Sequence, residues 1–139
     1  MAGKMIDTSL LESIGSCRQV ITTTIIIFST GEGWPRYCEQ MPRSPMPMIG
    51  QSVSNDFPQV LASALQENSA IHDGAILASR LDRQASYRVA AWSLRLFPPP
   101  VETNGYDNQG SAFNSCLAMS ATSMVDSAVI ISTERIIEF

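Results

Sequence analysis

The sequence predicts an α/β fold with a mixed central β-sheet flanked by helices. Segments rich in apolar and β-branched residues alternate along the chain with segments of helical periodicity, as expected when helices pack against a sheet. The last apolar runs, in residues 126–133 and 135–139, are short and continuous, which is typical of strands buried on both faces. A length of 139 residues suits one ordinary domain, so we expect residues 1–139 to form a single domain around one core.

The N-terminal segment predicts a short helix followed by a buried strand. After a Thr/Ser cap near Thr8, apolar residues recur at helical spacing: Leu10, Leu11, Ile14 and Cys17. The helix should end within residues 15–19. The β-branched run of residues 20–28 then predicts a strand, which the glycines and proline of residues 29–35 terminate.

A loop and a second helix are expected next. Residues 36–58 are rich in proline and predict a loop, with a short edge strand around residues 48–53. Asn55 or Asp56 can cap the helix that follows, and Pro58 is tolerated in its first turn. The core face of this helix should contain Val60, Leu61, Ala64 and Leu65. The helix should end near residue 68.

The second half of the chain predicts a hairpin, a loop, a helix and two strands. Residues 75–80 and 86–96 look like antiparallel strands, although the polar connection between them lacks the Asn-Gly or Asp-Gly of a tight turn. Residues 97–110 contain three successive prolines and predict a loop. Small and apolar residues from Ser111 onward then predict a helix packed closely on the sheet, and the two last apolar runs complete the sheet.

Composition excludes several classes of protein. The formal net charge is -4 and the only lysine is Lys4, so the chain has no basic stripe for a nucleic acid. The longest apolar run, residues 20–28, is far shorter than the ~20 residues of a membrane-spanning helix. The first fifteen residues lack the apolar core and cleavage site of a secretory signal. We therefore expect a cytoplasmic protein that binds neither nucleic acid nor membrane.

The reactive residues also limit the possible chemistry. Cys17, Cys38 and Cys116 form no CxxC pair, so reduced thiols are expected rather than disulfides or a zinc site. The chain has one histidine, which cannot form a multi-histidine metal site on its own. A P-loop and a nucleophile elbow are absent from the sequence. A Cys/His dyad remains formally possible.

The stretch "SAIHDGAILAS", residues 69–79, places the one histidine beside an Asp-Gly-Ala tripeptide. At the mouth of a strand, the Asp73 carboxylate can hold a divalent metal ion or orient a hydroxyl, while Gly74 and Ala75 leave room for a ligand. The same residues also have a structural interpretation, in which they serve the fold and bind no ligand. In it, Asp73 caps a turn, Gly74 relieves a bulge and a backbone carbonyl satisfies the hydrogen bonding of His72. Taken alone, these residues favour the structural interpretation.

The order of segments around this stretch resembles the diadenylate cyclase (DisA-N) domain. In that family an Asp-Gly-Ala motif follows Leu-His and precedes an apolar strand, and a later segment runs from Asp-Ala through apolar residues to Ser-Glu-Glu. Here "IHDGAILAS" is similar to the first motif, and "SMVDSAVIISTE", residues 123–134, resembles the second. The resemblance extends from about residue 10 to residue 134 and implies a diadenylate-cyclase-like fold.

The chain departs from this family where Gly-Thr-Arg-His-Arg opens a helix. The sequence there is "GSAFNSC", so Gly110 and Ser111 match Gly-Thr, whereas Ala112, Phe113 and Asn114 replace Arg-His-Arg. The resemblance implies that these basic residues hold the triphosphate in active members. Phosphoryl transfer depends on such charge stabilisation and on metal ions. The departure implies that catalysis is largely lost.

The resemblance therefore implies a catalytically degenerate domain that binds a nucleotide or similar small ligand and acts as a sensor or assembly module. The ligand-binding residues that it implies are His72, Asp73, Gly74, Ala75, Gly110, Ser111, Ser132 and Glu134. Active members work as face-to-face dimers, so a homo-oligomer is also implied.

Two alternatives stay open. The first is an active diadenylate cyclase that makes cyclic di-AMP from ATP with a non-standard phosphate clamp. Asp73 would then be catalytic and would hold Mg²⁺ or Mn²⁺, and the clamp would come from other arginines, such as Arg80, Arg83 or Arg95. The second alternative is a structural oligomerisation protein with an empty pocket. No cofactor is expected apart from the metal ion of an active enzyme.

Overall fold

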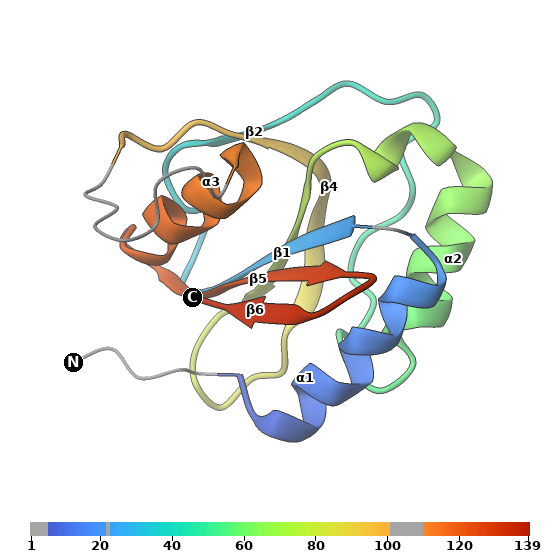
Figure 1. The fold of residues 1–139 in the computed structure, drawn as a ribbon, viewed down its shortest axis with the longest axis horizontal. Helices are drawn as coiled ribbons and strands as arrows, with labels where there is room; N and C mark the ends of the chain where they lie inside the picture. The colour runs from blue at the N-terminus through green and yellow to red at the C-terminus, as the bar shows by residue number, and fades with distance from the viewer. Residues whose placement is uncertain (1–5, 22, 101–109) are drawn as a thin grey trace.

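The computed structural model describes residues 6–21, 23–100 and 110–139, and within them it contains a mixed six-stranded sheet (Figure 1). The strand order is β2-β4-β3-β1-β5-β6. The strands are β1 (Thr23–Thr30), β2 (Cys38–Gln40), β3 (Ala75–Arg80), β4 (Arg88–Leu96), β5 (Val125–Ser132) and β6 (Ile136–Glu138). β1 and β3 are parallel, and the other neighbouring pairs are antiparallel. This arrangement confirms the predicted α/β fold with a mixed sheet.

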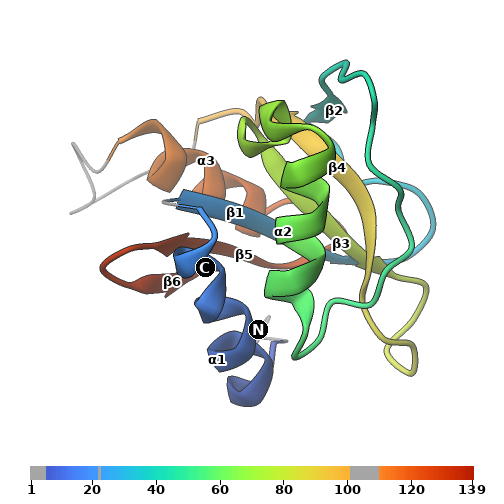
Figure 2. The same ribbon diagram turned by 90° about the vertical axis from the view of Figure 1, so that its right-hand side faces the viewer.

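Helices cover both faces of the sheet. The helical segments are α1 (Thr8–Gly15), the 3-10 helix η1 (Ser16–Gln19), α2 (Phe57–Glu67), the 3-10 helix η2 (Ser69–His72) and α3 (Ser111–Ser120). Figures 1 and 2 show α1 and α2 on one face and α3 on the other. Alternate residues of β1 follow this division, since Ile26 and Phe28 pack with α1 and α2 while Ile27 packs with α3.

The first helix and strand are present, but the helix has a different cap and the strand runs from Thr23 to Thr30 instead of over residues 20–28. The helix begins at Thr8, but its cap is Asp7, whose carboxylate accepts a hydrogen bond from the Leu10 amide at 2.8 Å. β1 begins at Thr23 instead of residue 20. The amides of Val20 and Ile21 donate to the Cys17 carbonyl at 2.9 and 3.0 Å, so these residues complete the turn after η1.

The edge strands differ from the prediction. The short strand β2 is Cys38–Gln40, whereas residues 48–53 only accompany β4 through isolated hydrogen bonds and one bridge between Ser52 and Arg88. β5 is buried over most of its length, but β6 is only partly buried because it lies at the edge of the sheet. The expectation that both last strands are buried on both faces is therefore wrong for β6.

The remaining predicted elements are present in the structure. α2 follows Asp56 and buries Leu61 and Ala64 of the predicted face. Val60 and Leu65 are only partly buried against the same core, and Phe57, which was not predicted there, is fully buried. β3 and β4 form the expected hairpin, and α3 begins at the expected Ser111. Residues 97–100 have no regular secondary structure, and the rest of the expected loop up to residue 109 lies outside the described residues.

A bulge in the β3–β4 hairpin lies beside the candidate site. Between the Ala75–Leu94 and Leu77–Ala91 pairs, β4 contains one more residue than β3. Ser93, in the extra stretch, is buried and has a φ of 60°. A residue with a side chain rarely adopts this backbone conformation inside a strand, so the bulge distorts β4 locally.

No helix in residues 6–21, 23–100 and 110–139 combines the length and the apolar character needed to span a membrane.

Candidate functional site

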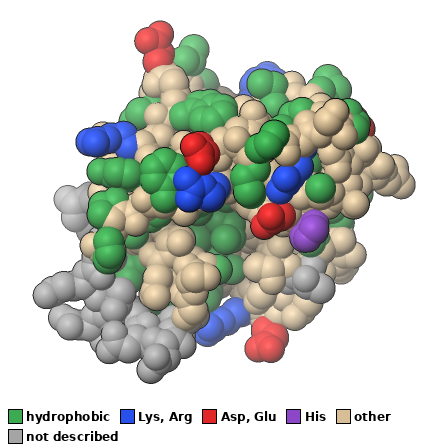
Figure 3. Space-filling model, turned by 90° about the horizontal axis from the view of Figure 1, so that it is seen from above, with side chains coloured by type: hydrophobic (Ala, Val, Ile, Leu, Met, Phe, Trp, Pro, Cys, Tyr) green, Lys and Arg blue, Asp and Glu red, His purple; other side chains and the backbone are tan. Residues whose placement is uncertain are grey.

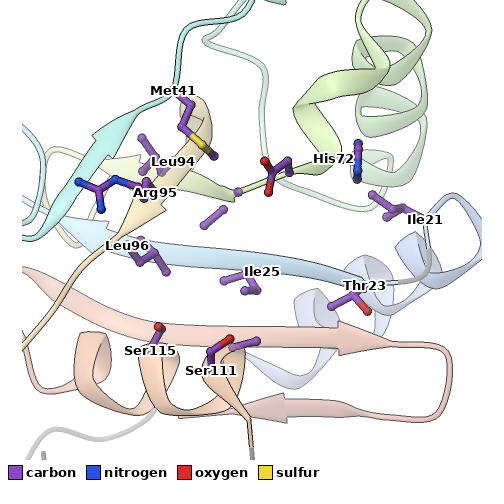
Figure 4. Close-up of a pocket in the computed structure, with 14 residues that line it drawn as sticks. Ile21, Thr23, Ile25, Met41, His72, Leu94, Arg95, Leu96, Ser111 and Ser115 are labelled. Carbon is purple, nitrogen blue, oxygen red and sulfur yellow. The ribbon is translucent and has the colours of Figure 1, made fainter. Parts of the chain in front are cut away.

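A cleft of about 530 Å³ opens at the end of the sheet where β1 and β3 begin and β4 ends (Figure 4). One wall is the first turn of α3, and the opposite wall is formed by η2, the start of β3 and the end of β4. Its lining residues are Ile21, Thr23, Ile25, Met41, His72, Asp73, Gly74, Ala75, Leu94, Arg95, Leu96, Ser111, Ala112 and Ser115. The volume falls within the range of small-molecule pockets.

The structure brings five of the eight predicted site residues to this cleft. His72, Asp73, Gly74 and Ala75 form one wall, and Ser111 faces them from the start of α3. The other three do not line it.

Gly110, Ser132 and Glu134 lie outside the lining. Gly110 precedes α3 as its cap residue. Ser132 pairs with Thr23 at the same end of the sheet, but its hydroxyl donates to the Arg135 carbonyl at 3.1 Å. Glu134 is exposed in the turn between β5 and β6.

Gly74 agrees better with the structural interpretation than with the role of leaving room for a ligand. Its φ is +103°, and a Cβ atom there would lie 2.8 Å from the carbonyl carbon of Ser93 and 2.9 Å from the carbonyl oxygen of Leu94. The space beside the glycine is thus filled by the bulged backbone of β4. Room for a ligand comes from the open side of the cleft, and Gly74 serves close packing of two strands.

Asp73 is held by two residues that sequence analysis did not single out. Arg43 Nη2 lies 3.4 Å from the Asp73 carboxylate, and Arg43 Nε donates to Ser93 Oγ at 3.1 Å. The Ser93 hydroxyl in turn donates to the backbone carbonyl of Asp73. The Asp73 side chain is 69% exposed, so the ion pair contributes at most about 1 kcal/mol and mainly orients the carboxylate.

His72 agrees with the structural interpretation. Its Nδ1 lies 2.8 Å from the backbone carbonyl oxygen of Ser69, within the same turn of η2. This contact fixes the ring at the rim of the cleft. Figure 3 shows the imidazole in purple beside acidic and basic side chains on this face of the molecule.

Arg95 is the one candidate clamp arginine that lines the cleft. Its Nη2 and Nε atoms lie 2.7 and 3.0 Å from Glu39 Oε1, across the β2–β4 pair. Both side chains are more than half exposed. The guanidinium also lies 4.9 Å from the centre of the Phe97 ring. Arg95 is therefore already paired.

Arg80 and Arg83 lie at the other end of the sheet, where β3 ends and the hairpin connection begins. Arg80 Nη2 is 3.9 Å from the Asp126 carboxylate, which also accepts hydrogen bonds from Thr30 Oγ1 and from the Tyr87 hydroxyl at 2.6 Å. Burial, followed by the hydrogen bond and negative charge of Asp126, raises the pKa of Tyr87. Asp126 belongs to the second family-like motif, and in this chain it joins three strands.

Cysteine chemistry has little support at the site. Burial raises the pKa of Cys17 and of Cys116 to about 12, so both remain thiols at neutral pH and lack the nucleophilic thiolate of a Cys/His dyad. The pKa of Cys38 is also raised by burial, and its thiol contacts the Pro35 carbonyl oxygen at 3.2 Å. Within the part of the chain that is described, no three His, Cys, Asp or Glu residues gather into a group that could hold a metal ion.

Comparison with known proteins supports the fold alone. No protein-family model and no curated protein matches the chain. Among solved structures, the fold is similar to that of a protein described as a hypothetical membrane spanning protein from Bacillus cereus, with a TM-score of 0.53 and 12% sequence identity. The match covers 95% of this chain and 60% of the other, so this chain spans less than two thirds of that protein.

Proposed function

We propose that the chain is a small-ligand-binding domain, similar to a diadenylate cyclase domain that has lost nucleotidyl transfer, and that a nucleotide or related molecule occupies the cleft. One observation carries this proposal. Two segments far apart in the sequence, residues 72–75 and the start of α3 at Ser111, face one cleft of suitable volume. The sequence alone predicts both segments as ligand-binding.

The chemistry of the cleft suits binding better than catalysis. Thr23, Ser111 and Ser115 supply hydroxyl groups around an apolar floor that includes Ile25 and Leu96. Such a mixture of apolar surface and a few polar groups is typical of small-molecule sites.

The positions expected to carry the phosphate clamp have other uses in this chain. Ala112 lines the cleft without a charge, and Phe113 packs edge-on against Phe139 with ring centres 4.9 Å apart. Neither residue can neutralise a triphosphate, which supports the loss of phosphoryl transfer.

The active-cyclase alternative is favoured by one observation, that Asp73 and Arg95 line the same cleft. In that case Asp73 would hold Mg²⁺ or Mn²⁺ together with phosphate oxygens of ATP, because such ions usually keep few protein ligands. Asp73 is already paired with Arg43, and Arg95 with Glu39, which weighs against an active cyclase. Incubation with ATP and either metal, followed by chromatography, distinguishes the two, since only the enzyme yields cyclic diadenylate.

Thermal unfolding with candidate ligands tests the binding proposal. A ligand that binds only the native state raises the midpoint of unfolding, by an amount that grows with its concentration above Kd. We expect such a shift with at least one nucleoside, nucleotide or cyclic dinucleotide. The structural-protein alternative predicts none.

A cleft-filling variant connects the shift to the proposed site. Ser115→Phe adds a ring on the cleft side of α3 and should abolish the shift, whereas Asn114→Phe adds the same ring to an exposed position of the same helix and should preserve it. Equal shifts in both variants would place the ligand elsewhere and overturn the proposal.

A further inference from the structure

The charged groups at the cleft are balanced. Asp73 and Arg95 are the two charged side chains among the residues that line it. Each has a partner of opposite charge outside the lining, Arg43 for Asp73 and Glu39 for Arg95. The cleft therefore carries no net charge from the side chains described around it.

The other described arginines do not line the cleft. All eight arginines are among the described residues, and Arg95 is the one that lines the cleft. Residues 101–109, which the structure does not describe, contain two acidic residues and no lysine or arginine. The start of α3 adds the partial positive charge of a helix N-terminus, about half an elementary charge, which attracts an anion but offsets only part of the charge of a mono- or triphosphate.

From this balance we infer that the cleft selects an uncharged, partly apolar small molecule, of the nucleoside type, over its phosphorylated forms. The inference rests on the proposed function and specifies its ligand class. Proteins that bind polyphosphates surround them with arginines, lysines, metal ions or several backbone amides. Here the apolar floor and the three hydroxyls can bury and orient a ligand, but a phosphate would displace water near Asp73 without gaining an unpaired cation from the described lining.

Matched ligand series test the selectivity. Calorimetric titration of the whole chain with adenosine, AMP and ATP, and with guanosine, GMP and GTP, gives Kd values in one buffer containing Mg²⁺. We expect the nucleoside of at least one series to bind three or more times tighter than its monophosphate and its triphosphate. We also expect the affinity of that nucleoside to change little between low and high salt, because no ionic contact is formed.

The outcomes separate this inference from the proposed function. A nucleotide that binds as tightly as its nucleoside, or more tightly, overturns the selectivity but leaves ligand binding at the cleft intact. If neither series nor cyclic diadenylate binds at millimolar concentration, the proposed function fails and the inference fails with it.

A charge variant tests the physical reason. Glu39→Gln removes the partner of Arg95 at an exposed position, so the freed guanidinium can pair with a phosphate. The affinity for AMP relative to adenosine should rise about two- to fivefold, the range typical of an exposed ion pair. Glu12→Gln makes the same change on the exposed side of α1, which covers the opposite face of the sheet from α3, and should leave the ratio unchanged. An equal effect of the two variants would refute the role of the Arg95–Glu39 pair.

Discussion

Replacing Gly74 by alanine tests the most specific feature of the motif, the close approach of the β4 backbone. The added Cβ would lie 2.8 and 2.9 Å from backbone atoms of Ser93 and Leu94, so it forces the strands apart. Overpacking of this kind costs about 1–3 kcal/mol, and the positive φ costs a further ~1–3 kcal/mol for a residue with a side chain. The total of about 2–6 kcal/mol is a large part of the ~5–15 kcal/mol that stabilises a typical domain.

Gly50 provides the matched control for this substitution. Its φ is +102°, nearly the same as that of Gly74, but nothing lies within 4 Å of a Cβ built there. Gly50→Ala should therefore show the backbone cost alone. Urea unfolding measures both variants, and at a slope of about 2 kcal/mol per M the midpoint should fall by roughly 1–3 M for Gly74→Ala and by at most ~1.5 M for Gly50→Ala. Equal losses would refute close packing at Gly74 and would reopen the space beside it as room for a ligand.

Three further predictions concern stability and assembly. Tyr87→Phe removes a hydrogen bond to the Asp126 carboxylate and should lower the free energy of unfolding by about 1–3 kcal/mol in urea titrations; no loss would mean that water replaces the hydroxyl. Because burial raises the pKa of Cys17 and of Cys116 from 9.0 to about 12, the unfolded chain loses these protons first. Stability should hold below about pH 9 and decline as pH rises through about 12, and Cys116→Ala should flatten this decline in urea titrations at several pH values. Finally, light scattering should give a mass of at least twice 15.1 kDa, as the homo-oligomer prediction requires; a monomer at micromolar concentration would contradict it.

Local sequence patterns were enough to locate most elements of the fold. The apolar run in β5 and the periodic face of α2 are strong signals, because burial dictates residue type at each position. The start of β1 was misplaced because the Val20 and Ile21 amides bond to the Cys17 carbonyl, a preference that β-branched side chains do not reveal. β2 was missed because three exposed or half-buried residues carry no periodic signal, and pairing with the end of β4 alone defines them.

The candidate site was only partly predictable for a related reason. Residues 72–75 and Ser111 were found through motifs, which are local in sequence. Ser93 acts through the bulge in β4, which has no sequence signature. Arg43 lies in the proline-rich loop, whose composition predicts a loop but not its return to the start of β3. Glu39 was missed with β2, so the neutralisation of Arg95 was not foreseen.

Residues 112–114, where the proposed resemblance would place a basic motif, are integrated into the packing of this chain. The Phe113 ring contacts Phe139, the last residue, and an aromatic pair of this geometry contributes about 0.5–1.5 kcal/mol beyond its buried area. Ala112 and Ser115, beside it on α3, keep the cleft wall short and uncharged. Placing arginine and histidine at positions 112–114 would therefore remove the aromatic contact with Phe139 at the same time as it adds charge. The packing of Phe113 on Phe139 thus favours an uncharged first turn of α3, which agrees with the proposed preference of the cleft for uncharged ligands.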